Sequence, residues 1–146
     1  MSFSEILVQA ADEYGLALTT DQVDHFNTYF EMLVEWNEKI NLTAITEAQD
    51  VAVKHMIDSL SCYDQEIFKK GATIIDVGTG AGFPGLPLKI FRPDLTLTLF
   101  DSLNKRILFL QAVAEKVGIN DMRFIHSRAE DGGKSKQLRE QYDIAV

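Results

Sequence analysis

A run of alternating glycines directly after a buried strand constrains the fold of this chain more than any other feature. Residues 73–77 (TIIDV) predict the strand, residues 76–83 (DVGTGAGF) carry the glycines, and residues 86–91 continue with helical spacing. Glycine permits positive φ angles and lets a ligand approach the backbone. This order of strand, glycine turn and helix predicts the first unit of a parallel α/β sheet that holds a small molecule above the turn.

The alternation of strands and helices continues after this unit. Residues 95–100 and 122–125 have strand patterns, and residues 107–117 have a helical pattern that closes at Gly118. Residues 134–141 predict a short helix, and residues 142–146 predict a last strand. We therefore expect an α/β, Rossmann-like fold in which helices flank a parallel sheet that is truncated after about four strands.

The first seventy residues have helical patterns only, without strand patterns between them. Ser2, Thr20 and Thr46 can each cap an amphipathic helix, and the texture changes near Gly71 without a flexible linker. We predict an N-terminal helical extension over residues 1–70, packed against a ligand-binding domain over residues 71–146 whose C-terminal strands are missing.

The glycine spacing separates two classes of cofactor. A dinucleotide-binding turn reads G-x-G-x-x-G, whereas here the third glycine comes one residue early, as Gly78-x-Gly80-x-Gly82. This spacing, preceded by the acidic Asp76, favours S-adenosylmethionine, which carries a sulfonium cation and no pyrophosphate. Asp101 ends the second strand about twenty residues after the turn, where a carboxylate can accept hydrogen bonds from both ribose hydroxyls.

Further polar residues follow the same predicted edge of the sheet. The segment 127–131 (SRAED) comes after the third strand, and the helix after Asp101 begins with Lys105 and Arg106. We expect the basic residues in this half of the chain to offer phosphate contacts near the site: Lys89, Arg92, Lys105, Arg106, Arg123 and Arg128.

Two polar residues of the helical extension are also candidates. His55 and Asp58 share a helix face at i, i+3 spacing, so they could pair, bind substrate or transfer a proton. A structural contact between helix and sheet is the favoured interpretation of this pair.

Composition and charge narrow the class of protein. The 146 residues are 46% hydrophobic, which suits one globular domain. No apolar run long enough for a membrane span and no export signal are visible, so we expect a cytoplasmic protein without a membrane partner. Cys62 is the single cysteine and has no disulfide or zinc-site partner in the sequence, so we predict no metal.

The net charge of −8 is unevenly divided. Residues 1–70 carry 13 Asp and Glu against 4 Lys and Arg, a net charge of −9, whereas residues 71–146 carry 9 against 10, a net charge of +1. A polyanion should therefore meet the second half of the chain, because phosphate neutralisation needs Lys and Arg.

Taken together, these segments resemble the glucose-inhibited division protein B family, the bacterial methyltransferases of guanine N7 in small-subunit (16S) ribosomal RNA. The resemblance runs through residues 36–45 (WNEKINLTAI), 55–60 (HMIDSL), 76–90 (DVGTGAGFPGLPLKI), 101–106 (DSLNKR) and 127–131 (SRAED). The family pattern continues beyond residues 142–146 with an Arg-containing segment and three further strands.

The resemblance implies roles for individual residues. Gly78, Gly80 and Phe83 would contact the methionine part of S-adenosylmethionine, Asp101 the ribose, and Ala129 with Glu130 the adenine. We add Asp76, Gly82 and Ser102 as cofactor-binding candidates, and the following as substrate-binding candidates: His55, Asp58, Lys105, Arg106 and Arg128. The implied partner is small-subunit ribosomal RNA or the ribosomal subunit, and we expect a monomer.

The implied reaction needs few protein groups. Guanine N7 is an exposed lone pair that can attack the sulfonium methyl without prior deprotonation, so no catalytic base or nucleophilic cysteine is predicted. The alternatives are a methyltransferase with another substrate and a non-catalytic fragment that binds S-adenosylmethionine. The glycine spacing disfavours a nicotinamide oxidoreductase.

Overall fold

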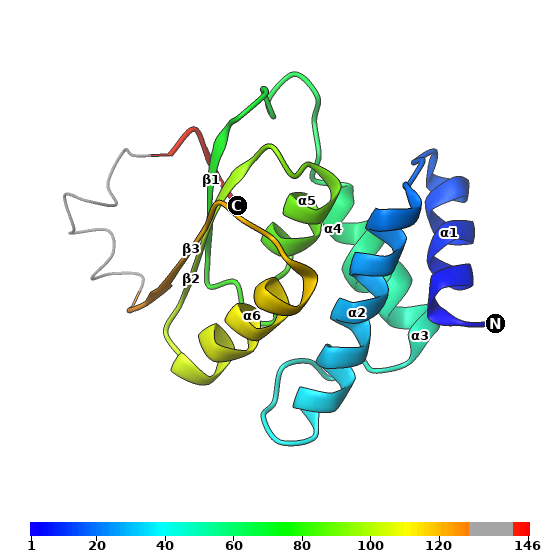
Figure 1. The fold of residues 1–146 in the computed structure, drawn as a ribbon, viewed down its shortest axis with the longest axis horizontal. Coiled ribbons are helices and arrows are strands. Elements are labelled where there is room, and N and C mark those ends of the chain that lie inside the picture. Colours follow the sequence, from blue (N-terminus) through cyan, green and yellow to red (C-terminus); the bar gives the residue numbers. More distant parts are fainter. Residues whose placement is uncertain (129–141) are drawn as a thin grey trace.

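A four-stranded parallel sheet forms the centre of the C-terminal half (Figure 1). The structure, a computed structural model, describes residues 1–128 and 142–146. The strands lie in the order β3-β2-β1-β4, and all three neighbouring pairs are parallel. Their bounds are β1 Thr73–Val77, β2 Thr96–Asp101, β3 Met122–His126 and β4 Ile144–Ala145. The strand order confirms the predicted Rossmann-like fold, because 3-2-1-4 is the order in which such sheets are wound.

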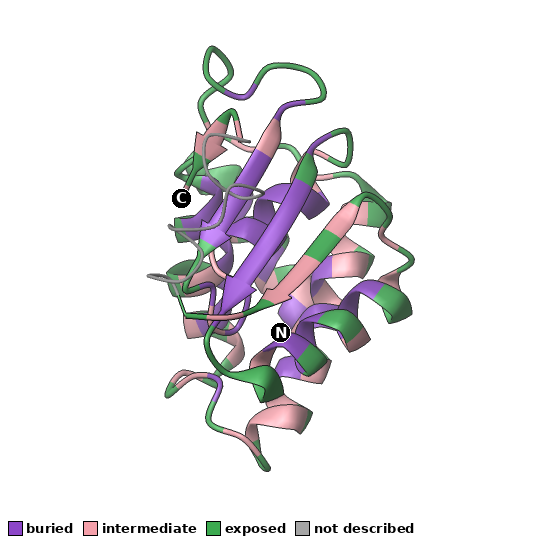
Figure 2. Cartoon of the chain, turned by 90° about the vertical axis from the view of Figure 1, so that its left-hand side faces the viewer, coloured by how far each residue is buried: buried purple, intermediate pink, exposed green. Residues whose placement is uncertain are grey.

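The helices form two layers on one side of this sheet. In Figure 1, α5 and α6 lie against the sheet and the N-terminal helices lie beyond them, while Figure 2 shows the sheet with these helices behind it. The bounds are α1 Phe3–Tyr14, α2 Thr20–Asn37, α3 Ala48–Asp50, η1 Val51–Ile57, α4 Asp58–Leu60, α5 Gly85–Phe91 and α6 Asn104–Val117. The predicted helix 134–141 lies outside the described residues.

Local signals explain where these helices begin and end, with two corrections to the sequence analysis. Thr19, rather than Thr20, caps α2, because its hydroxyl accepts the Gln22 amide while Gln22 accepts the Thr19 amide. The N-cap of the predicted third helix is Glu47 rather than Thr46, and the middle of this helix, η1, is a π-helix. Gly118 ends α6 in the left-handed conformation, as its pattern predicted.

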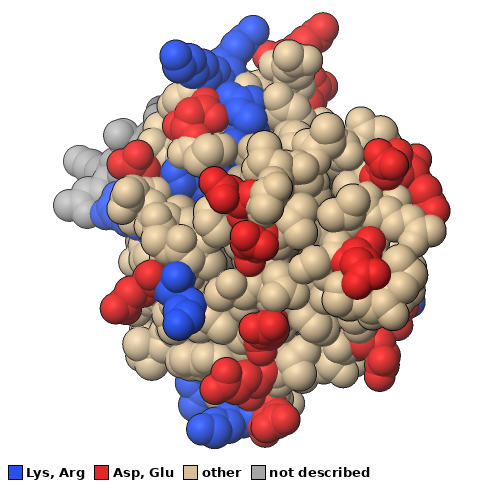
Figure 3. All heavy atoms as spheres, turned by 45° about the vertical axis from the view of Figure 1, so that its right-hand side comes forward, with Lys and Arg blue, Asp and Glu red and all other residues tan. Residues whose placement is uncertain are grey.

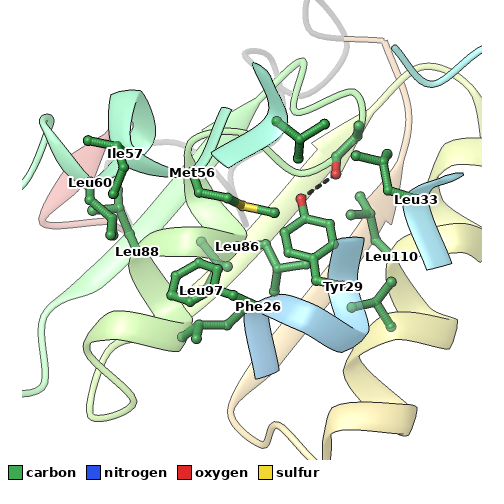
Figure 4. Close-up of a cluster of buried hydrophobic side chains, with 14 of the residues drawn as sticks. Phe26, Tyr29, Leu33, Met56, Ile57, Leu60, Leu86, Leu88, Leu97 and Leu110 are labelled. Carbon is green, nitrogen blue, oxygen red and sulfur yellow. Dashed lines mark hydrogen bonds between the residues drawn. The ribbon is translucent and has the colours of Figure 1, made fainter. Parts of the chain in front are cut away.

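One hydrophobic core joins the N-terminal helices to the sheet. Helix α5 is buried on nearly all sides and packs against α2, whose buried side chains are Phe26, Tyr29 and Leu33 (Figure 4). The same buried cluster includes Leu97 of β2 and Met56 of η1. The N-terminal helices pack mainly on α5 and α6, which lie between them and the sheet, and not on the sheet itself as expected. None of the helices in the described residues has the length and apolar character needed to cross a membrane.

Candidate functional site

The glycine turn joins the carboxyl end of β1 to α5. Gly78 and Gly80 have φ angles of 69° and 60°, a conformation that side chains rarely adopt. A Cβ added at either position would meet no atom within 4 Å, so space is open above the turn. The amides of Gly78 and Thr79 donate to the Phe100 carbonyl of β2 at 2.8 and 3.1 Å, which fixes the turn against the neighbouring strand.

Asp76 braces the turn from beneath. Its Oδ2 accepts the Thr79 hydroxyl at 2.7 Å and the Gly85 amide at 2.9 Å, and the residue is 2% exposed. Burial raises the pKa of Asp76 to about 6, against the lowering effect of these two hydrogen bonds. This carboxylate, which the sequence analysis set beside a cationic ligand, is therefore held by the chain itself.

Gly85 has to lack a side chain because Asp76 is so close. An added Cβ would lie 2.7 Å from Asp76 Oδ2 and 3.0 Å from Leu99 Cδ2. Gly85 was not among the predicted site residues, since it falls outside the G-x-G-x-G spacing and directly before the residues with helical spacing.

Asp101 holds the turn from the second strand. Its Oδ2 accepts the Gly80 amide at 2.8 Å, its Oδ1 accepts the Leu103 amide at 2.9 Å, and Oδ1 lies 3.6 Å from Nη1 of Arg106. The residue is 2% exposed. A carboxylate has about four acceptor positions, so it keeps capacity for a hydroxyl group.

The predicted residues after β2 and β3 lie along the same edge of the sheet. Arg106 is half-buried, and its buried Nε has no hydrogen-bond partner among the described residues. Ser102 and Lys105 are exposed, and the Ser102 carbonyl is 3.0 Å from Nε2 of His126 at the end of β3. Arg128 is exposed two residues further on. Ala129 and Glu130 lie outside the described residues.

His55 meets the turn through a ring stack. Its imidazole lies parallel to Phe83, with centroids 4.3 Å apart and an interplanar angle of 8°, and its Nε2 is 2.8 Å from the Thr43 hydroxyl. His55 therefore contacts the turn, whereas the favoured interpretation expected a contact between helix and sheet. Asp58 is exposed and, among the described residues, forms no ion pair with His55. Burial lowers the pKa of His55, against the opposing charge of Asp58.

Two of the side chains predicted to contact phosphates, those of Lys89 and Arg92, instead form hydrogen bonds within the protein. The Lys89 ammonium is buried and donates to the carbonyls of Pro93 and Leu95, and burial lowers its pKa. The Arg92 guanidinium donates to Asp94, to the Tyr63 hydroxyl and to the Phe68 carbonyl. Both side chains close the loop after α5, so neither is available to a phosphate.

The charge distribution follows the sequence. Figure 3 shows Asp and Glu scattered over the face formed by the N-terminal helices, with Lys and Arg mainly toward its edges. Within residues 1–128 and 142–146, no three His, Cys, Asp or Glu side chains come together as a metal site.

A parallel sheet with this strand order, a glycine turn after β1 and an acid at the end of β2 defines the Rossmann-like class of folds that bind nucleotides or S-adenosylmethionine. Residues 22–146 match the model of one family, GidB, described as rRNA small subunit methyltransferase G. The chain therefore belongs to the GidB family, as its resemblance predicted.

Curated relatives agree with this assignment. Ribosomal RNA small subunit methyltransferase G of Alkaliphilus metalliredigens is 52% identical over all 146 residues, and that of Clostridium perfringens is 51% identical over the same length. The chain spans 61% of the length of both relatives. A crystal structure of coclaurine N-methyltransferase bound to N-methylheliamine and SAH has a TM-score of 0.47 and 12% identity, and the match covers 86% of this chain and 44% of that one.

Proposed function

We propose that this chain is the cofactor-binding part of an S-adenosylmethionine-dependent methyltransferase that modifies N7 of a guanine in 16S ribosomal RNA. The observation that carries the proposal is the glycine turn, held by Asp76 and Asp101 with open space above Gly78 and Gly80. Its membership of the GidB family, and the names of its relatives, support the choice of reaction and substrate.

The residues at the turn fit this cofactor. A backbone without side chains at Gly78 and Gly80 admits close approach, and Asp101 offers remaining acceptor capacity beside it. Gly78, Gly80, Gly82 and Phe83 would hold the methionine part, and Asp101 with Ser102 the ribose. Asp76 would act by fixing the turn, because its carboxylate is already engaged by Thr79 and Gly85. Ala129 and Glu130 remain candidates for the adenine.

S-adenosylmethionine supplies an activated methyl group, so the chain has only to align the guanine and exclude water. Proton abstraction is not needed at N7, which suits a His55 ring that is held by Thr43 and Phe83. Lys105, Arg106 and Arg128 lie at the same sheet edge and would meet RNA phosphates. We place the protein in the cytoplasm, as a monomer that acts on the small ribosomal subunit.

Calorimetric titration of the chain with S-adenosylmethionine, S-adenosylhomocysteine and NADH tests the cofactor first. We expect binding of the first two only, and loss of binding in Asp101→Ala. Asp12→Ala, on the exposed side of α1, is the matched control and should bind as the wild type does. Thermal melts identify a variant that has merely unfolded. Binding of NADH, or no binding of either sulfur compound, would contradict the proposal.

Methyl transfer tests the substrate. The chain and its full-length relative from Clostridium perfringens are each given radiolabelled S-adenosylmethionine and small ribosomal subunits that lack the modification. Label on guanine N7 supports the proposal. Label on a protein or small molecule instead would favour a different methyl acceptor, and cofactor binding without transfer by either protein would favour a binding module.

A further inference from the structure

A tyrosine of the N-terminal helices reaches the glycine turn. Tyr29 lies in the middle of α2 and is fully buried, and its hydroxyl donates a hydrogen bond of 2.5 Å to the Ala81 carbonyl (dashed line in Figure 4). Burial raises the pKa of this phenol well above its usual value, with a smaller contribution from the charge of Asp76. The hydroxyl therefore stays protonated and acts as a donor at neutral pH.

The same side chain touches the next two residues of the turn. A Cβ added at Gly82 would collide with the Tyr29 hydroxyl oxygen and would lie 2.8 Å from Leu110 Cδ2. The Tyr29 ring also packs on Phe83, with centroids 5.5 Å apart and an interplanar angle of 22°. Residues 81, 82 and 83 are thus all fitted to one side chain of α2.

Three side chains from three elements divide the turn between them. Asp76 of β1 holds Thr79 and Gly85, Asp101 of β2 holds Gly80, and Tyr29 of α2 holds Ala81. The first two belong to the sheet that carries the turn. Tyr29 is the one hydrogen-bonding side chain of this set that comes from the N-terminal helices.

We propose that Tyr29 is a positioning residue for the cofactor turn, which fixes the peptide groups of residues 81–83 and thereby sets the affinity for cofactor. This inference rests on the proposed function, because the turn must bind S-adenosylmethionine. Packing alone does not require the hydroxyl, since phenylalanine would fill the same volume without burying a polar atom. Helix α2 is then part of the cofactor site as well as of the helical extension.

The variant Tyr29→Phe removes the hydroxyl group and keeps the aromatic ring, so it tests the hydroxyl alone. The variant leaves the buried Ala81 carbonyl without its donor, so the turn can reorient and the affinity for ligand should fall. We expect the dissociation constant for S-adenosylhomocysteine, measured by calorimetry, to rise about five- to tenfold, the equivalent of one hydrogen bond. Urea unfolding of the same samples measures stability in parallel.

Two controls separate positioning from stability. Tyr63→Phe removes a hydroxyl that accepts a hydrogen bond from Arg92, on the loop between α4 and β1, and should leave the dissociation constant within about twofold of wild type. Phe26→Leu disturbs the core of α2 one turn before Tyr29 and should lower stability with the same small effect on affinity. An unchanged dissociation constant in Tyr29→Phe, or an equal loss of affinity in Phe26→Leu, overturns the inference.

A measurement on the wild type covers the case in which Tyr29→Phe fails to fold. With ring-labelled tyrosine, the Tyr29 resonance is the one that remains when Tyr14, Tyr63 and Tyr142 are each replaced in turn by phenylalanine. It should shift when S-adenosylhomocysteine is added, while the Tyr14 resonance stays in place. If S-adenosylhomocysteine binds saturably and the Tyr29 resonance does not shift, the inference is overturned while the proposed function stands. Absence of binding by the wild type overturns the proposed function and the inference with it.

Discussion

Asp76 is an acid whose charge is costly in the folded chain, which predicts a particular dependence of stability on pH. Its pKa of about 6 lies above the value of about 3.9 in an unfolded chain, so the folded state binds the proton more tightly. The stabilisation is complete below pH 4 and is lost as the pH rises through 6. The free energy of unfolding of wild type minus that of Asp76→Asn should therefore fall by about 2.5 kcal/mol between pH 4 and pH 8.

Urea titrations of both proteins across this range measure the difference, and Asp94→Asn is a control that should show almost no change between pH 4 and pH 8. A hydrogen bond from Arg92 holds the pKa of Asp94 well below its usual range, so the stability that Asp94 contributes is lost only as the pH falls below about 4. If the Asp76 difference stays constant from pH 4 to pH 8, the carboxylate is not buried as described.

For single residues, the sequence predicts which residues lie at the site better than it predicts which atoms they contact. The spacing of the glycines selects Asp76 and Asp101 as site residues, but it does not reveal that both accept hydrogen bonds from the turn. Gly85 and Tyr29 are not among the predicted site residues, because Gly85 falls outside the G-x-G-x-G spacing and Tyr29 lies about fifty residues before the turn. Gly85 matters because Asp76 lies against it, and Tyr29 because it bonds to Ala81. Contacts between residues far apart in sequence cannot be read from a local pattern.

At the scale of the element, the two adjacent threonines before α2 offer a direct test of helix capping. The Thr19 hydroxyl accepts the Gln22 amide at 3.1 Å, whereas Thr20 is the first helical residue and is exposed. Thr19→Ala should cost about 1 kcal/mol of unfolding free energy, the usual loss for an N-cap. Thr20→Ala should change it by less than about 0.5 kcal/mol. Equal effects in denaturant titrations would argue against the capping box.

The local sequence patterns predicted the strands well but did not predict the π-helix. The predicted strands at 73–77, 95–100 and 122–125 differ from β1, β2 and β3 by at most one residue at an end. The strands β1 and β2 are buried over most of their length, which favours apolar runs, whereas β3 lies at the edge of the sheet with half-buried and exposed residues. The π-helix η1 was not predicted, since its wider turn has no periodic signature that separates it from an α-helix over seven residues. It carries His55, so the i, i+3 argument for a pair with Asp58 assumed the wrong helix geometry.

At the scale of the whole molecule, the division of charge predicts how the chain meets RNA. The acidic face of the N-terminal helices repels a polyanion, whereas Lys105, Arg106 and Arg128 follow β2 and β3 at the edge of the sheet where the turn opens. Three cations that neutralise single-stranded phosphates release about 0.7 counterion each, so the logarithm of the association constant should fall with the logarithm of salt concentration with a slope of about −2.

Filter binding to small ribosomal subunits at a series of salt concentrations measures this slope. Lys105→Ala should make it shallower by about 0.7, because one phosphate contact is lost. Lys54→Ala is the matched control, since Lys54 is an exposed lysine of the N-terminal helices that lies 3.6 Å from Asp50, and it should leave the slope unchanged. A slope near zero would mean that RNA does not meet this edge. A much steeper slope, or one that depends on Lys54, would mean that the RNA crosses the N-terminal helices, where its phosphates would have to approach a surface with 13 acids against 4 bases.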